Sequence, residues 1–429
     1  MVQTRVAVIG AGAAGLAMCR YLVNEPQIHF VAFEKACDIG GVWRYTKDSG
    51  HAVSEHNSTA MYKNLRTNLP KEVMAYPDLP FPQNLPSFIT NADVQKYLET
   101  YTEHFNFKKY IKFNHQVLSI KPGNKDKEVW DVVVKDLTNE TTHKIVFDAI
   151  VVCNGHYSVP RFPEIPGFDS FPGKVIHSVN YDKPEDYQDQ DVVVLGAGSS
   201  GLDIAMELSK FSKKVFLVHL RNKLPVKFPE NVQEVIGTLT TCFQDGSIEI
   251  NHEKLLQNVN AIILCTGYNY SFPFLEPECD INVTNSCVTS LYKHTFSTKF
   301  PSLSFIGLCI RILPFLTFAA QAQCIAAVLS GRIMLPNKEE MVQDEAFDYQ
   351  ERLKQGLSKN MMHLLGVERH MQYCTTMAEM AGVPCTLSLP IQSLFSYVSK
   401  IRLPKLASYR KCNFTISGDE WHEVKNYTS

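Results

Sequence analysis

The alternation of apolar and polar positions is clearest near the start of the chain. Residues 5–35 contain an apolar run, a glycine-rich turn, a helix-like stretch and a second apolar run that ends at Glu34. Strand, helix and strand in this order predict a βαβ unit. The same pattern returns at residues 191–220 and predicts a second unit.

Other segments extend the prediction. We expect long ordered loops over residues 36–90, which are rich in Gly, Pro and Asn, then a helix from about Asn91 and a strand hairpin over residues 117–136. Long ordered loops are uncommon unless they line a site. Residues 300–331 predict a strand, a loop and a helix beginning at Gln321. The chain after about residue 340 is expected to be mainly helical until a polar end.

The chain of 429 residues is long enough for two or three domains. A buried strand at residues 147–155 leads into a proline-rich segment, where we place a boundary. The predicted fold class is α/β with two Rossmann-like dinucleotide-binding domains. The larger is formed by residues 1–160 and 295–429, with a mainly helical C-terminal extension, and the smaller, residues 161–294, is inserted into it.

Composition excludes several classes of function. The net charge of -2 argues against an electrostatic binder of nucleic acid, and no apolar run is long enough to span a bilayer. The twelve cysteines include no CxxC pair, which favours free thiols in a reducing compartment. Because the first strand begins almost at Met1, we expect a soluble, cytoplasmic protein, or a secreted one if a signal peptide has been removed.

The first glycine-rich turn contains Gly10, Gly12 and Gly15 directly after a strand and at the start of a helix. The first glycine permits the tight turn, the second a close approach of pyrophosphate, and the third close packing of helix on strand. Glu34 follows Gly15 by 19 residues and can accept hydrogen bonds from ribose hydroxyls. The turn therefore suits FAD or NAD, and a glycine-rich turn without a ligand remains the alternative.

The second turn repeats the spacing with Gly196, Gly198 and Gly201. No acid ends its second strand, and Arg221 and His219 could contact a 2′-phosphate there, which favours NADP. Two such sites in one chain indicate electron transfer from a nicotinamide to a second dinucleotide. The alternative is that one copy has lost its ligand.

A stretch between the two turns carries a resemblance to a known family. Phe171, Gly173, His177 and Tyr181 resemble the FxGxxxHxxx(Phe/Tyr) signature of the flavin-containing monooxygenases, and similarity to this family extends over most of residues 5–336. Baeyer–Villiger relatives usually have Trp where Tyr181 stands, so this residue favours the branch that oxygenates nitrogen and sulfur. His177 is either a catalytic base or a linker histidine that fixes domain contacts, and we favour the linker interpretation.

The resemblance implies FAD in the first site, NADPH in the second and O2 as co-substrate, with no metal. Asn68 matches the family asparagine beside the reactive edge of the flavin, and Gln321 matches a flavin-ring contact. The departure at Leu220, where members often have a basic residue, weakens the expected preference for NADPH over NADH. The candidate FAD-binding residues are Gly10, Gly12, Ala13, Gly15, Glu34, Lys35, Gly41, Val42, Trp43, Leu65, Thr67, Asn68, Val117 and Gln321. The candidate NADP-binding residues are Gly196, Gly198, Ser199, Ser200, Gly201, Arg221, Thr266 and Gly267.

The reaction implied by the resemblance is the oxygenation of a soft nucleophile. NADPH reduces FAD, O2 adds at flavin C4a to give a hydroperoxide, and NADP+ stays bound while a tertiary amine or thioether takes up one oxygen. The short form is similar to insect members, among them pyrrolizidine-alkaloid (senecionine) N-oxygenases, which implies a role in detoxification. Three alternatives are Baeyer–Villiger oxygenation of ketones, a disulfide reductase, which the lack of CxxC disfavours, and a nucleotide-sensing module. Self-association into a dimer or tetramer through the C-terminal region is a further hypothesis.

Overall fold

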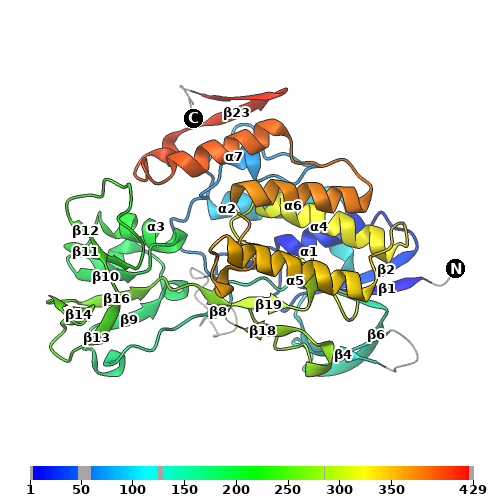
Figure 1. Ribbon diagram of the computed structural model, residues 1–429, viewed down its shortest axis with the longest axis horizontal. Helices are drawn as coiled ribbons and strands as arrows, with labels where there is room; N and C mark the ends of the chain where they lie inside the picture. The colour runs from blue at the N-terminus through cyan, green and yellow to red at the C-terminus, as the bar shows by residue number, and fades with distance from the viewer. Residues whose placement is uncertain (1–2, 47–58, 124–128, 285, 425–429) are drawn as a thin grey trace.

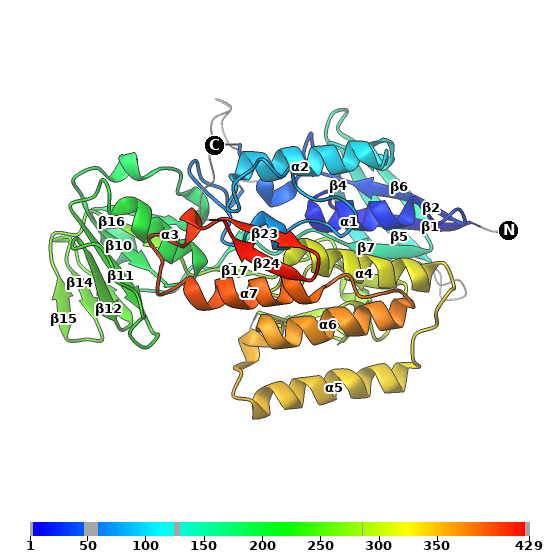
Figure 2. The same cartoon turned by 90° about the horizontal axis from the view of Figure 1, so that it is seen from above.

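The computed structural model describes residues 3–46, 59–123, 129–284 and 286–424, so part of the predicted loop region lies outside the described residues. Two large, mainly parallel sheets dominate it, one at each end of the long axis (Figure 1). This arrangement confirms the predicted α/β class with two dinucleotide-binding-type units. A layer of C-terminal helices covers the larger unit (Figure 2).

The first sheet has the strand order β20-β21-β22-β7-β1-β2-β3. The strands from β22 to the edge strand β3 are parallel, whereas β20 and β21 pair antiparallel at the other edge. The helix α1 (Ala13–Leu22) connects β1 to β2. The strands are β1 Thr4–Ile9, β2 Ile28–Phe33, β3 Ile111–Lys112, β7 Ala149–Val152, β20 Leu291–Tyr292, β21 Phe296–Ser297 and β22 Leu303–Phe305. Residues of β7 are buried on both faces, as expected for a central parallel strand.

The second sheet has the order β12-β11-β10-β16-β9 and is parallel throughout. The helix α3 (Ser199–Leu208) connects β10 to β11 and completes the second βαβ unit. The strands are β9 Lys174–His177, β10 Asp191–Leu195, β11 Lys214–His219, β12 Val232–Ile236 and β16 Ala261–Leu264. Both sequence-predicted units are therefore confirmed.

The chain passes between the two sheets through a short ribbon. The strand β8 (Val159–Pro160) lies on the outgoing connection and pairs antiparallel with β17 (Tyr268–Asn269) on the return. After β17 the chain joins the first unit, because Ile120 N donates to Phe274 O and β20 pairs into the first sheet. We therefore propose that the inserted domain ends near residue 269 rather than at 294.

The C-terminal helices are α4 (Pro314–Leu329), α5 (Lys338–Lys354), α6 (Gly366–Ala381) and α7 (Leu389–Ile401). The helix α4 packs against both α1 and α6, and α5 lies outermost (Figure 2). The helix α4 begins at Pro314, so the prediction that it starts at Gln321 was wrong. The residues 314–320 are nearly all apolar and buried, and they show no polar face from which a helix could be recognised.

The polar end of the chain, for which no secondary structure was predicted, forms the hairpin β23 (Phe414–Ser417) and β24 (Glu420–Glu423). The predicted helix near Asn91 is α2 (Asn91–His104), and the predicted hairpin belongs to a three-stranded antiparallel sheet. The smaller sheets consist of β4 His115–Pro122, β5 Trp130–Asp136 and β6 Thr141–Phe147; β13 Leu239–Cys242, β14 Ile248–Ile250 and β15 Lys254–Leu256; and β18 Asn282–Thr284 with β19 Cys287–Thr289.

Among the described residues, no helix combines the length and the apolar character needed to cross a membrane. All twelve cysteines lie within the described residues and are free thiols.

Candidate active site

The first glycine-rich turn has the geometry that dinucleotide binding needs. Gly10 has a φ of +105°, a conformation that side chains with a Cβ rarely adopt. A Cβ at Gly15 would lie 1.9 Å from the carbonyl oxygen of Gly10, so only glycine lets α1 pack this closely on the turn. Gly12 precedes α1 as its N-cap, and the helix begins at Ala13. No side chain caps the N-terminus of α1, so its backbone N–H groups can serve an anion.

Glu34 and the following segment surround this turn. The buried Glu34 carboxylate accepts hydrogen bonds from Ala11 N at 2.7 Å and Ala36 N at 2.9 Å. A Cβ at Gly41 would lie 2.9 Å from Cα of Gly12, which shows how closely the two backbones approach. Trp43 ends the short helix η1 (Gly41–Trp43), which also contains Val42. Lys35 is exposed beside Glu34.

Asn68 lies at the end of a tightly held segment. Thr67 is buried, its N donates to Ile89 O at 2.9 Å, and its hydroxyl accepts from Ile89 N at 3.2 Å. Leu65 O accepts from Asn91 N at 3.3 Å, at the start of α2. Asn68 itself is half-buried, and its side chain has no hydrogen-bond partner within the described part of the chain. The backbone thus fixes an amide that is available to a ligand.

The second turn repeats the first. Gly196 has a φ of +109°, and a Cβ at Gly201 would lie 1.8 Å from Gly196 O. A Cβ at Gly198 would meet no atom within 4 Å, so the backbone there borders open space. Ser199 and Ser200 begin α3 and are exposed. The turn therefore fits a pyrophosphate at a helix N-terminus.

The structure corrects the prediction for His219. Its Nε2 lies 3.1 Å from Glu234 Oε1, and its Nδ1 accepts from Arg221 N at 3.1 Å. Both ring nitrogens of this buried histidine are occupied, so it is not placed to contact a phosphate. Leu220 is 78% exposed and adds no charge.

Arg221 has basic neighbours that the sequence did not reveal. Its pKa is lowered by partial burial and by the positive charges of Arg311 and Arg402. Arg311 precedes α4 and Arg402 is the C-cap residue of α7, so three separate segments bring these charges together. Such a group favours a phosphate. Because the three arginines are far apart in the sequence, no local pattern predicted this group.

The signature histidine fixes the block before the return strand. His177 is fully buried at the end of β9, and its Nε2 lies 3.0 Å from Gly267 O. Arg161 donates from Nε and Nη2 to Thr266 O at 3.0 and 2.7 Å. These hydrogen bonds to the backbone are consistent with the linker interpretation of His177. Thr266 and Gly267 are half-buried and lie where β16 of the inserted unit leads into the ribbon.

Gln321 and Val117 were also expected near the flavin, and both side chains are buried in the protein. Gln321 is fully buried inside α4; its Oε1 accepts from Gly307 N at 3.1 Å, and its Nε2 donates to Tyr373 Oη at 2.8 Å and Thr295 Oγ1 at 3.2 Å. Its amide therefore fixes the backbone of the segment that follows β22. Val117 is buried in β4, a strand that begins beside Glu34, where His115 N donates to Glu34 O at 2.8 Å.

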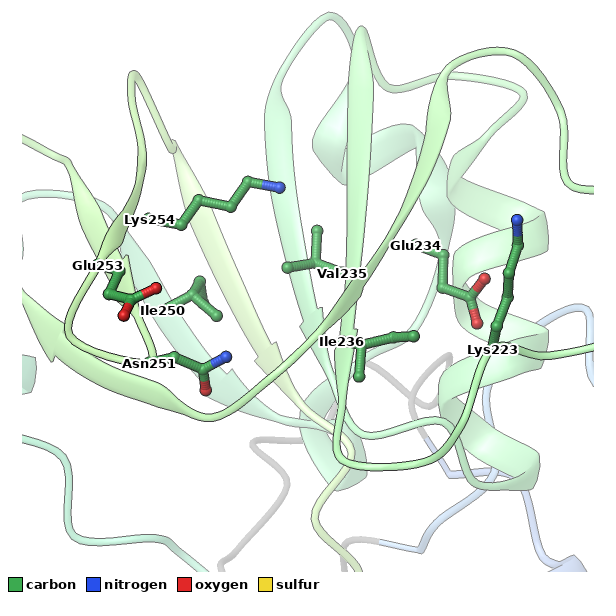
Figure 3. Close-up of a pocket in the computed structure, with 8 residues that line it drawn as sticks. All are labelled: Lys223, Glu234, Val235, Ile236, Ile250, Asn251, Glu253 and Lys254. Carbon is green, nitrogen blue, oxygen red and sulfur yellow. The ribbon is translucent and has the colours of Figure 1, made fainter.

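Two surface cavities lie apart from these turns. One of about 440 Å³ is bordered by the end of β12 and the turn between β14 and β15, with Lys223 and Lys254 balanced by Glu234 and Glu253 (Figure 3). Its balanced charge and lack of predicted site residues give no reason to assign it a ligand. The second, about 760 Å³, adjoins the ribbon and is lined by Arg161, Asn269, Tyr270, Val283, Ser286, Ser358, Lys359 and Asn360.

The model of a protein family described as flavin-binding monooxygenase-like matches residues 3–224 and 220–395. The chain belongs to this family. It is 38% identical over 399 residues to the flavin-containing monooxygenase FMO GS-OX5 of Arabidopsis thaliana, covering 88% of this chain and 85% of that protein. The structure of S-allyl-L-cysteine S-oxygenase from Allium sativum matches with a TM-score of 0.86 at 36% identity, over 95% of each chain. Tmm from Pelagibacter sp. strain HTCC7211 matches with a TM-score of 0.83 at 26% identity, over 95% of this chain and 93% of Tmm.

Family membership settles the class of chemistry. The protein is a flavoprotein monooxygenase, an oxidoreductase that uses FAD, NADPH and O2, as the sequence predicted. The residues present fit both dinucleotides, because each glycine-rich turn leads into a helix whose N-terminus no side chain caps, and Glu34 lies beside the first turn. Likeness to OTEMO in complex with FAD and NADP, at 12% identity, concerns the fold alone.

Proposed function

We propose that this monooxygenase transfers one oxygen atom to the sulfur of a small thioether or the nitrogen of a small tertiary amine, giving an S-oxide or N-oxide. The observation that carries the proposal is the match with S-allyl-L-cysteine S-oxygenase over 95% of each chain. Tyr181, where Baeyer–Villiger relatives usually have Trp, supports the same branch. A thioether is therefore the first substrate to test.

We propose that FAD binds the first turn, with its ribose at Glu34 and its ring near Trp43, Leu65 and Asn68, and that NADPH binds the second turn and Arg221. When bound, the two cofactors supply the electrons and activate O2. The protein's part is to position them and to exclude water from the reacting edge.

Asn68 is the residue we assign to the reaction itself. Its amide donates hydrogen bonds without titrating, so it can hold the cofactor region or the substrate at any physiological pH. The surrounding backbone bonds at Thr67 and Leu65 keep this amide in place. Because an amide is neither acid nor base, the substrate must supply its own nucleophilicity, which favours a soft sulfur or nitrogen atom.

The test compares a thioether, a tertiary amine and a cyclic ketone with the purified protein, FAD and NADPH, measuring NADPH consumption and oxygenated product. The proposal predicts S-oxide or N-oxide in amounts close to the NADPH consumed, and little ester from the ketone. Lactone or ester as the main product would identify a Baeyer–Villiger enzyme instead. A pyrrolizidine alkaloid such as senecionine is the tertiary amine of choice.

A further inference from the structure

The C-terminal segment reaches the residues next to Asn68 through one arginine. Arg410 lies in the short helix η9 (Tyr409–Lys411), and the segment that follows α7 extends toward α3 (Figure 2). Its Nε donates to Thr67 O at 3.0 Å, and its Nη2 lies 3.3 Å from Arg66 O. These two carbonyl groups belong to the residues that directly precede Asn68. This side chain from the C-terminal segment therefore fixes the two residues that precede Asn68, which we place at the reacting edge.

The same guanidinium also binds the helix that begins at the second glycine-rich turn. Both Nη atoms of Arg410 contact the Asp203 carboxylate, with Nη2 2.9 Å from Oδ2. Tyr62 donates its hydroxyl to the same Oδ2 at 2.6 Å. The Asp203 and Arg410 side chains are 16% and 24% exposed, so this ion pair is largely shielded. Two-point contact with a carboxylate and a planar fork make arginine difficult to replace here.

Asp203 lies close to the proposed pyrophosphate site. It is four residues after Ser199, the first residue of α3, which places it about 6 Å along the helix axis. An uncompensated carboxylate at that distance would oppose an anion at the helix N-terminus, since the screening length is about 8 Å at physiological salt. Arg410 neutralises this charge. The one arginine thus serves both the Asn68 segment and the nucleotide helix.

We propose that Arg410 is a positioning residue of the monooxygenase: it fixes the segment that carries Asn68 and compensates Asp203, so that NADP+ is retained beside the reacting edge. This inference deepens the proposed function and rests on it for the role of Asn68. It assigns the C-terminal segment a part in catalysis that neither glycine motif nor signature indicates.

The experiment compares the FAD-loaded wild type with Arg410→Ala, Asp203→Asn, the double variant and the control Lys411→Ala, an exposed neighbour in the same helix. Two quantities are measured: the dissociation constant of NADP+ by titration, and the fraction of NADPH that yields oxygenated product. Arg410→Ala is expected to weaken NADP+ binding at least fivefold and to lower coupling severalfold. The Lys411→Ala control is expected to change neither.

The double variant separates the two effects. Removing the Asp203 charge in the Arg410→Ala background is expected to restore NADP+ affinity to within twofold of wild type, because the charge that Arg410 compensates is then absent. Coupling is expected to stay low, since the bonds to Thr67 O and Arg66 O are still missing. If Arg410 had only a structural role, its removal would not affect NADP+ affinity and coupling separately. Removing the Asp203 charge would then not restore NADP+ affinity.

Arg410→Ala with unchanged NADP+ affinity and coupling would overturn the inference, as would a double variant that binds NADP+ no better than Arg410→Ala. If Arg410→Ala fails to fold, Arg410→Lys keeps the charge but loses the fork, and it is expected to lower coupling while preserving affinity; wild-type coupling in that variant would also overturn it. NADP+ titration needs no turnover. If the wild type oxygenates neither thioether nor amine, the proposed function fails while the charge compensation is still tested.

Discussion

The imidazole Nε2 of His177, at the end of β9, lies 3.0 Å from the carbonyl oxygen of Gly267, which follows the neighbouring strand β16. Its Nδ1 accepts from Val179 N at 3.2 Å, so the neutral ring donates from Nε2. Burial lowers the pKa of His177, which keeps the ring neutral. The family signature thus contains a histidine that connects the incoming strand to the block leading back to the first domain.

His177→Ala tests this reading. The variant removes one of the two hydrogen bonds that Gly267 O accepts, since Arg161 N still donates to it at 2.9 Å, and it leaves a cavity where the buried ring stood. We therefore expect a loss of about 1–3 kcal/mol in the free energy of unfolding. Urea unfolding of the FAD-loaded protein measures it. Turnover at saturating NADPH is expected to fall far less than for a catalytic base. A near-complete loss of turnover with unchanged stability would instead indicate catalysis by His177.

Asn68→Ala removes the amide that we place at the reacting edge. The variant is expected to keep its FAD and to consume NADPH, but to release mainly hydrogen peroxide rather than oxygenated substrate. The ratio of product to NADPH consumed measures the effect. Asn64→Ala, an exposed residue in the same segment, is the matched control. Intact coupling in Asn68→Ala would remove the role that we assign to this side chain.

Arg221→Ala removes a charge from the proposed 2′-phosphate site. We expect the KM for NADPH to rise roughly 10- to 100-fold, the equivalent of one charge-assisted hydrogen bond at about 1.5–3 kcal/mol, and the KM for NADH to change little. Steady-state kinetics with both nucleotides give the comparison, and Leu220→Ala is the neighbouring control. Equal changes for NADPH and NADH would mean that Arg221 does not recognise the phosphate. If the Arg221→Ala variant still prefers NADPH over NADH, we expect Arg311 and Arg402 to provide the remaining contacts with the 2′-phosphate.

Glu207 predicts a pH dependence of stability. Burial raises its pKa from 4.5 to about 7, and its carboxylate accepts a hydrogen bond from the Tyr181 hydroxyl at 3.0 Å. Because the folded pKa exceeds the unfolded one, this group's stabilising contribution is complete below about pH 4.5 and is lost as the pH rises through about 7. The change is on the order of 2 kcal/mol after allowance for solvent.

Glu207→Gln mimics the protonated acid and is expected to flatten this part of the stability profile. The free energy of unfolding of the variant would then be similar at pH 5 and pH 8. At pH 8 the variant would be more stable than the wild type. Tyr181→Phe serves as the companion variant because it removes the hydroxyl that binds Glu207. A wild-type slope retained in Glu207→Gln would assign the pH dependence to other groups.

The sequence predicted the parts of the fold that depend on local pattern. The turns at Gly10 and Gly196 were visible because a tight turn, close helix packing and an open anion site each demand glycine at a set spacing. The start of α4 was missed because its first turns are apolar on every side. His219 was misjudged because Glu234, its partner, lies on the adjacent strand β12.

The residues brought in from the C-terminal segment were beyond local reasoning. Arg410 meets Thr67 across 343 positions, and the pairing with Asp203 spans 207. No local sequence pattern, such as the periodicity of a helix, carries information on contacts between residues so far apart in the sequence. Only the packing of α7 and the segment after it places Arg402 and Arg410 beside the nucleotide domain.

Oxygenation through a flavin that NADPH reduces can be followed in a single experiment on the purified protein loaded with FAD. NADPH is added without oxygen, and air and a thioether are then admitted while the visible flavin absorbance and the S-oxide are followed. We expect that NADPH bleaches the flavin, that air restores the colour, and that S-oxide forms in proportion to the NADPH consumed. A chain that takes up no flavin, or a bound flavin that NADPH leaves unchanged, would contradict it.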